Sequence, residues 1–161
     1  MRRTKSLFTI LAMSALAAIC GFAQTPEKPA NPKYDAELAK KTGADDYGMR
    51  SYVLAILKTG PNDGKVTGEA RSELFKGHFA NMGRLAGEGK LALAGPFSDP
   101  NKKFRGLFIL AVKTVEEARA LAETDPTVKA GVLVVEYIPW SGSAALMLTN
   151  ENHDKVGKKS F

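Results

Sequence analysis

Apolar side chains recur at every third or fourth position between residues 74 and 85. This spacing is typical of one face of an amphipathic helix. We expect the helix to begin near Thr67, capped by the hydroxyl of that threonine, and to end around Gly87 or Gly89. His78 lies on the same face, although histidine is polar. Ring nitrogens directed at a core need hydrogen-bond partners, so the pattern predicts a partner for His78 elsewhere in the chain.

Four apolar runs of strand length accompany this helix. They are SYVLAILK (51–58), LALAG (91–95), FRGLFILAV (104–112) and VLVVEYIPW (132–140). The first run is followed by a segment, Thr59 to Gly64, that is rich in glycine, proline, asparagine and aspartate. These residue types favour turns and end strands. We therefore expect four strands, with the helix between the first two.

A second helix is indicated between the third and fourth runs. Thr114 and Glu117 have the spacing of a capping box, in which the threonine side chain accepts from the Glu117 N–H and the glutamate reaches back. The residue before a proline disfavours helix, so we expect the helix to stop at 124–126. Asp125 then caps a further short turn that has Pro126 as its first residue.

The expected order of elements is strand, helix, strand, strand, helix, strand. Two such units form a ferredoxin-like βαββαβ sandwich of the α+β class. Two helices cover one face of a four-stranded sheet, yet three of the runs are apolar on both alternations, which is typical of strands buried on both faces. We therefore expect a second copy of the sheet to cover the other face, giving a face-to-face homodimer.

Residues 1–23 have the pattern of a secretory signal peptide. A basic segment, MRRTKS, is followed by the apolar run LFTILAMSALAAICGF and by small residues near Ala23, the order found in signal peptides. We expect cleavage after Ala23, within a residue or two, and a periplasmic or secreted protein with no membrane span once the signal is removed. The alternatives are a retained membrane helix and a lipoprotein attached through Cys20, which the bulky Ile19 before it disfavours.

The boundaries of the remaining segments of the chain follow from their composition. Residues 24–47 hold three prolines among charged residues and are interpreted as a linker or arm. Tyr34 and Leu38 are the candidates to anchor one short helix within it, and a frayed arm is the alternative. Residues 48–141 form the ferredoxin-like domain, and residues 142–161 form a C-terminal tail.

Charge and ligand-forming side chains exclude several functions. The formal net charge is +6, but three of the basic residues and no acid precede Ala23, which leaves only +3 for the rest. With no basic stripe, this argues against a nucleic-acid partner. Cys20 is the single cysteine, so the rest of the chain has no disulfide, thiolate metal site or cysteine nucleophile. His78 and His153 lack the spacing of zinc ligands, and we expect no metal and no cofactor.

Several of these motifs together resemble the YCII-related family. They are YVLAILKTGPN, HFANMGRLAGEGKLALAGPF, FRGLFIL and ETDPTVKAGVLVVEYIPW, which span roughly Tyr52 to Trp140. The resemblance implies the dimeric α/β barrel form of the ferredoxin-like fold. It also implies an active site made of a histidine and an aspartate, which correspond to His78 and Asp125. Some members resemble lyases or isomerases that act on hydroxylated or halogenated ring compounds, and most have no assigned reaction.

His78 and Asp125 are therefore the catalytic candidates. A carboxylate beside a histidine fixes one tautomer and stabilises the protonated ring, so that the other nitrogen serves as acid or base near neutral pH. This arrangement suits proton transfer, as in isomerisation or elimination. Each residue also has a structural interpretation, His78 as a hydrogen-bonded core histidine and Asp125 as a helix cap alone.

Substrate-binding candidates are Tyr52, Pro96, Phe97 and Arg105. Tyr52 and Phe97 are suited to line a pocket, and packing in the core or in a dimer is the alternative for each. Pro96 ends a strand, which favours a structural role. Arg105 and Glu136 are charges within apolar strands, and they suit either an anionic substrate or an ion pair between strands or subunits.

The sequence thus supports two hypotheses about function. The first is an exported, homodimeric YCII-like enzyme that performs acid–base chemistry of the isomerase or lyase type on a small cyclic or aromatic substrate. The alternative is a non-catalytic module of the same fold that binds a small ligand or has a structural role. Catalysis needs His78 and Asp125 in contact and open to a cavity, ligand binding needs the cavity alone, and a structural role needs neither.

Overall fold

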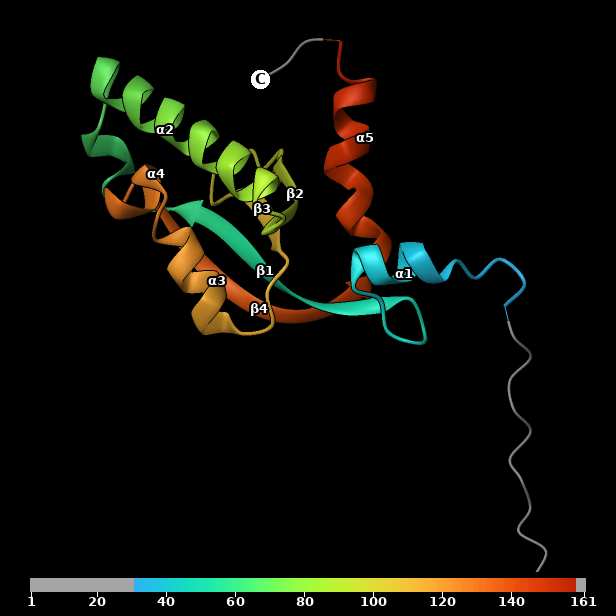
Figure 1. Ribbon diagram of the computed structural model, residues 1–161. Coiled ribbons are helices and arrows are strands. Elements are labelled where there is room, and N and C mark those ends of the chain that lie inside the picture. The colour runs from blue at the N-terminus through green and yellow to red at the C-terminus, as the bar shows by residue number, and fades with distance from the viewer. Residues whose placement is uncertain (1–30, 159–161) are drawn as a thin grey trace, which may run out of the picture. The chain divides into compact units, whose positions relative to one another are not determined.

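Four antiparallel strands form one sheet in the order β2-β3-β1-β4 (Figure 1). The computed structural model describes residues 31–158, and its helices and strands all belong to one unit, residues 33–161. The strands are β1 (Met49–Thr59), β2 (Leu91–Pro96), β3 (Phe104–Leu110) and β4 (Leu133–Ser143). Each strand lies where an apolar run predicts one.

Helices connect the strands on one side of the sheet (Figure 1). They are α2 (Gly68–Gly87), which joins β1 to β2 after a short 3-10 turn η1 (Asp63–Lys65), and α3 (Val115–Ala122) and α4 (Pro126–Lys129), which join β3 to β4. This order, with β1 and β3 paired at the centre, is the ferredoxin-like arrangement. The expected α+β fold class is confirmed, and its dimeric form stays a prediction.

The main core lies between these helices and the sheet. Val53 and Leu57 of β1 pack in one cluster with Leu85 of α2 and Ala118 of α3, and all four are nearly inaccessible. Apolar surface removed from water in this way favours folding by about 25 cal/mol per Å². His78 lies two turns before Leu85 on the same face of α2, so this packing also directs His78 inward.

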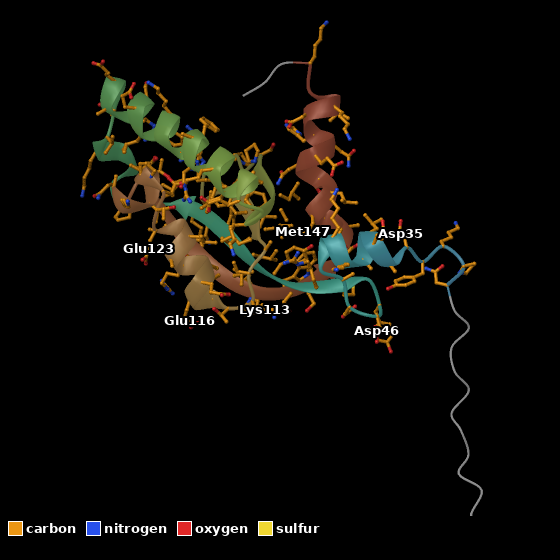
Figure 2. The ribbon with its side chains drawn as sticks, in the orientation of Figure 1. Asp35, Asp46, Lys113, Glu116, Glu123 and Met147 are labelled. Atoms are coloured by element: carbon orange, nitrogen blue, oxygen red, sulfur yellow. The ribbon has the colours of Figure 1, made fainter. Side chains whose placement is uncertain are left out.

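A second cluster lies on the opposite face of the sheet. It consists of Tyr52, Ala92, Ile109 and Ala111, and Leu146 and Met147 pack against it. The last two belong to a 3-10 segment, η2 (Ala144–Leu148), which is followed by α5 (Thr149–Val156) and lies beside α1 (Ala36–Thr42). Figure 2 shows Met147 near the base of α5. The C-terminal tail therefore covers one end of this face.

Apolar side chains of β4 stay open to solvent on the rest of this face. Ile138 pairs with Leu54 and Trp140 pairs with Tyr52, so both point to the second face. Val134, Ile138 and Trp140 are 40%, 42% and 38% exposed. We call these three side chains the β4 strip. A second copy of the sheet remains the predicted cover for the strip.

The predicted capping box is present at the start of α3. The backbone N–H of Glu117 donates to Oγ1 of Thr114 at 3.1 Å, and the Thr114 N–H donates to Oε2 of Glu117 at 3.2 Å. The predicted cap at Thr67 is wrong, because its side chain makes no cap hydrogen bond, although α2 does begin after it. Gly68 has φ of 59°, and this left-handed entry does not bring the Thr67 hydroxyl to the first-turn N–H groups.

The predicted arm contains α1, but the expected anchors do not hold it. Tyr34 and Leu38 are 66% and 41% exposed. Thr42 at the end of α1 is buried instead, and Lys41 forms an ion pair of 2.8 Å with Glu151 of α5. The contact of α1 with the tail therefore takes the place of apolar anchoring.

The predicted signal peptide, residues 1–23, lies outside the described residues. Between residues 31 and 158, no helix is long and apolar enough to cross a membrane. Export and signal cleavage therefore stay predictions.

Candidate functional site

His78 contacts the corner of the chain that leads into α4. Its Nδ1 lies 2.6 Å from Oδ2 of Asp125, which is a short, well-formed hydrogen bond. The Asp125 side chain is fully buried and that of His78 is 9% exposed. The structure brings together the two candidate catalytic residues from positions 47 residues apart.

Asp125 uses its two carboxylate oxygens for different purposes. Oδ1 accepts from the backbone N–H of Thr127 at 2.9 Å and from its hydroxyl at 2.6 Å, and so caps α4. Oδ2 remains for His78. The helix-cap interpretation and the dyad interpretation of Asp125 are therefore compatible.

Asp125 is an ionised carboxylate at neutral pH. Burial on its own raises the pKa of Asp125, because water no longer solvates the charge. The hydrogen bonds from His78 and Thr127 outweigh burial and hold the pKa of Asp125 below its ordinary value. The buried charge is therefore sustained by the donors that surround it.

The ionised carboxylate fixes the tautomer of His78. A carboxylate only accepts hydrogen bonds, so Nδ1 of His78 must carry the hydrogen. In the neutral ring, Nε2 then presents a lone pair. Among residues 31–158, no group hydrogen-bonds Nε2, and 9% of the His78 side chain stays exposed. Nε2 is thus available to exchange a proton with a bound molecule.

Three aromatic rings surround the imidazole of His78. Phe108 of β3 is stacked on it, with 5.8 Å between ring centroids and 24° between planes. Phe75 and Phe79 meet it edge-on at 5.8 and 5.4 Å. Phe79 is 54% exposed, so an aromatic surface beside His78 is open at the outside of the protein.

The close approach of α2 to α4 depends on Gly77. A Cβ at this position would lie 2.8 Å from Cγ of Pro126, nearer than ordinary carbon contacts allow. Pro126 directly follows Asp125, and Gly77 directly precedes His78. The absence of a side chain at residue 77 therefore allows the approach on which the His–Asp bond depends.

Three of the substrate-binding candidates have other partners. Tyr52 is buried in the second-face cluster, and its hydroxyl donates to the carbonyl oxygen of Ser143 at 2.9 Å. Pro96 ends β2, and Phe97 packs edge-on against Phe104. Within residues 31–158, no hydrogen bond, ion pair or ring contact joins these candidates to the dyad. A role for them in binding a ligand stays a prediction.

The two charges within apolar strands both form ion pairs inside the chain. Arg105 lies 3.3 Å from the Asp63 carboxylate, which also pairs with Arg71 at 2.8 Å. Glu136 of β4 pairs with Lys58 of β1. The structure therefore displays the ion-pair alternative for both residues, and the role of Arg105 toward an anionic substrate stays a prediction.

Thr127, Phe75 and Phe108 belong to the site but were not among the sequence candidates. Thr127 carries a signal in the sequence, because a hydroxyl two residues after a capping aspartate is within reach of its carboxylate. Phe75 lies three residues before His78, and such residues share a helical face. No local pattern places Phe108 beside His78, since the two meet only through the packing of α2 on β3.

An open hollow of about 310 Å³ lies away from the dyad. It is lined by the loop 43–45 after α1, by residues 49–51 of β1, and by Lys113 and Ser141; Figure 2 labels Lys113. His78 and Asp125 do not line it. In the described part of the chain, no group of three or more His, Cys, Asp or Glu side chains is arranged to hold a metal ion.

Asp125→Asn is expected to lower the free energy of unfolding by about 1–3 kcal/mol at neutral pH, because a charged buried acceptor is lost. The pKa of Asp125 is lower in the folded protein than its ordinary value. Ionised Asp125 therefore stabilises the fold above the unfolded-state pKa of about 3.9, and this stabilisation is lost as the pH falls below it through the folded-state pKa.

Urea unfolding of wild type and Asp125→Asn, from neutral pH to about pH 3, measures this effect. We expect the difference in unfolding free energy between them to shrink below about pH 4. Asp154→Asn, at an exposed position of α5, is the matched control and should change little. A difference for Asp125→Asn that stays constant over the whole range would contradict the account of its charge.

Known proteins match this domain over most of its length. A family model described as the YCII-related domain matches residues 52–141. The uncharacterized protein YjpA of Bacillus subtilis (strain 168) is 32% identical over 92 residues, which are 57% of this chain and 95% of YjpA.

A solved structure also matches about half of this chain. It is 5-chloro-2-hydroxyhydroquinone dehydrochlorinase (TftG) from Burkholderia phenoliruptrix AC1100, in complex with 2,5-dihydroxybenzoquinone. It is 22% identical, has a TM-score of 0.42, and covers 55% of this chain and 92% of its own. These values are too low to support a conclusion about activity. The family match spans more than half of the chain and YjpA is matched almost end to end, so the chain belongs to the YCII-related domain family, as its motifs predict.

Proposed function

We propose that this protein is a small-molecule enzyme in which His78 and Asp125 form a dyad for acid–base chemistry. The observation that carries the proposal is the 2.6 Å hydrogen bond between Nδ1 and Oδ2, with Nε2 left unbonded by the described residues. General acid–base catalysis by histidine uses this arrangement, in which one ring nitrogen is fixed and the other meets the substrate.

Nε2 of the neutral His78 ring removes a proton from the bound molecule, and the imidazolium that forms is stabilised by the charge of Asp125. In an isomerisation, Nε2 returns this proton to another atom of the same molecule. In an elimination, the C–H electron pair becomes a double bond, the leaving group departs with its own bonding pair, and the imidazolium then passes the proton to the leaving group or to water. Asp125 stays ionised throughout, since its pKa is held low.

A small cyclic or aromatic molecule is the proposed substrate. The rings of Phe75, Phe79 and Phe108 enclose the imidazole, and aromatic rings favour other rings in stacked or edge-on contact. The exposed ring of Phe79 adjoins His78, so a ligand that packed on Phe79 would lie beside the histidine. A planar compound with an exchangeable C–H or O–H proton meets both conditions.

The second candidate function is binding of a small ligand without turnover. The same aromatic surface favours it, because ring packing needs no proton transfer. In this case His78 would recognise the ligand through a hydrogen bond from or to Nε2. A purely structural dimeric module is the remaining alternative, and it requires no ligand at all.

A homodimer is part of the proposal. The β4 strip of Val134, Ile138 and Trp140 is exposed on the same face of the sheet as half-buried Leu54, and the Glu136–Lys58 ion pair lies between Val134 and Ile138. Monomeric proteins rarely leave such apolar surface open across a sheet. A two-fold related copy of the same face would cover it. The tail packs against Tyr52 at the Trp140 end of the strip, and the three strip side chains keep their exposure beside it.

Export to the periplasm or the exterior is also proposed. It rests on the basic, apolar and small-residue segments within residues 1–23, which have the order of a signal peptide.

His78→Gln is expected to lower turnover by about 10²–10⁴-fold, because the proton carrier is lost while a side chain of similar length remains. The assay is a screen of hydroxylated ring compounds in D₂O, in which NMR reports product and deuterium incorporation. His153→Gln on α5 is the matched control and should leave turnover unchanged. Undiminished turnover by His78→Gln would refute the acid–base role, and binding without turnover by wild type would favour the second candidate.

Ile138→Glu is expected to convert a dimer into a monomer, because it introduces a charge at the centre of the β4 strip. Sedimentation velocity measures the state of association. Val156→Glu is the matched control, since Val156 is 80% exposed on α5 and lies outside the strip. A wild-type protein that sediments as a monomer would contradict the proposed homodimer.

The intact mass of the protein, recovered from the exported fraction of the source cell, tests whether the signal peptide is cleaved. We expect a mass that corresponds to a chain beginning at Gln24 or within a residue or two of it. Recovery of a chain that begins at Met1 and remains inside the cell would overturn the proposed export.

A further inference from the structure

We propose that Asn81 and Thr124 are a positioning pair that sets the distance between His78 and Asp125. The inference rests on the proposed function, because it concerns the geometry of the same dyad. Asn81 follows His78 by about one turn of α2, and Thr124 directly precedes Asp125. Each member of the dyad thus has a neighbour on its own element, and the two neighbours are hydrogen-bonded to each other.

Three contacts in succession join α2 to the corner before α4. The first is the close approach of Gly77 to Pro126, and the second is the dyad itself. The third is the hydrogen bond from the Thr124 hydroxyl to Oδ1 of Asn81, at 2.9 Å. The dyad therefore lies between two other contacts of the same elements, and its atoms cannot separate by a rotation of the corner unless one of those contacts breaks.

Arg84 holds the Asn81 amide in one orientation. Its Nη2 donates to Oδ1 of Asn81 at 2.8 Å and to Oγ1 of Thr124 at 3.0 Å, while Nη1 donates to Glu88 at 2.8 Å. A reversed amide would turn its NH₂ group toward the guanidinium, which cannot accept a hydrogen bond. The amide oxygen is therefore fixed toward Thr124. The single hydroxyl hydrogen of Thr124 is shared between this oxygen and the Leu121 carbonyl oxygen, which lies at 2.6 Å.

Asn81 is a poor choice for stability alone. It is 8% exposed, and its Nδ2 is buried with no hydrogen-bond partner among the described residues. A buried donor without an acceptor costs free energy, whereas an apolar side chain of the same shape has no such cost. Leucine would fill the position without the orphaned donor. The feature that only an amide or a carboxylate supplies is the acceptor for Thr124 and Arg84.

The consequence for His78 is geometric. A hydrogen bond between a buried carboxylate and an imidazole fixes the tautomer only while the two atoms stay in line and close. Catalytic groups that drift by a fraction of an ångström lose much of their efficiency. Without the Asn81–Thr124 contact, only the hydrogen bond from Arg84 to Thr124 would hold the corner to α2 on that side of the dyad.

NMR of the His78 ring tests this inference without any substrate. In wild type we expect a low-field Nδ1 proton at neutral pH, assigned by its loss in His78→Gln. In Asn81→Leu we expect loss of this signal through exchange with water, while the protein stays folded. Asn81→Asp keeps the acceptor and should restore the signal. Glu88→Gln, which removes only the charge of the outer partner of Arg84, is the matched control and should retain it.

A signal that persists unchanged in Asn81→Leu would overturn the positioning role. If Asn81→Leu does not fold, Thr124→Val removes the same hydrogen bond from the other side, and a persistent signal in that variant has the same meaning. Because these spectra need no turnover, they test the positioning role of Asn81 and Thr124 independently of the proposed reaction. If the proposed enzyme activity fails but the signal behaves as expected, Asn81 and Thr124 still position a histidine that binds rather than catalyses.

Discussion

The arrangement of the site depends on one buried charge, the carboxylate of Asp125. A fully buried carboxylate is costly unless donors surround it, and here the backbone and hydroxyl of Thr127 and the ring of His78 supply them. Two of these donors lie at the start of α4 and the third lies on α2. The hydrogen bonds that satisfy this one charge therefore cap α4 and also join α4 to α2. The same charge determines which nitrogen of His78 faces outward.

A capping residue and an orienting carboxylate are usually treated as alternatives for an aspartate before a proline. In this chain one residue is both, since each oxygen has its own partners. The packing around it follows from that double role. Gly77 lets Pro126 approach, and Asn81 receives the hydroxyl of Thr124, so the polar contacts of the corner lie on the α2 face that also supplies Leu85 to the core.

The sequence predicts the parts of the fold whose signals are local. Apolar runs of strand length indicate the four strands, and the Thr114–Glu117 spacing and the Asp125–Pro126 pair indicate helix starts that the structure contains. The pairing of His78 with a distant carboxylate follows from the need of a core histidine for a partner, while the choice of Asp125 came from the family resemblance. No local pattern distinguishes that aspartate from others.

Features that depend on tertiary contact could not be predicted. The helix α5 is polar and has no apolar stripe from which it could be predicted. It follows η2, whose Leu146 and Met147 cover part of the second face of the sheet. Arg105 meets Asp63 only because β3 lies near the turn after β1. The orphaned amide of Asn81 is visible only once α2 is packed against the corner that carries Thr124.

The central claim is that Asp125 holds the ring hydrogen of His78 on Nδ1 and so leaves Nε2 to face a bound molecule. The rate at which diethyl pyrocarbonate acylates His78 in the folded protein, followed by mass spectrometry of the peptide that contains it, tests this most directly. Reaction requires an accessible ring nitrogen with a free lone pair. The account predicts acylation of His78 at neutral pH in wild type. A His78 that stays unmodified in the folded protein, yet reacts once urea unfolds it, would contradict the account.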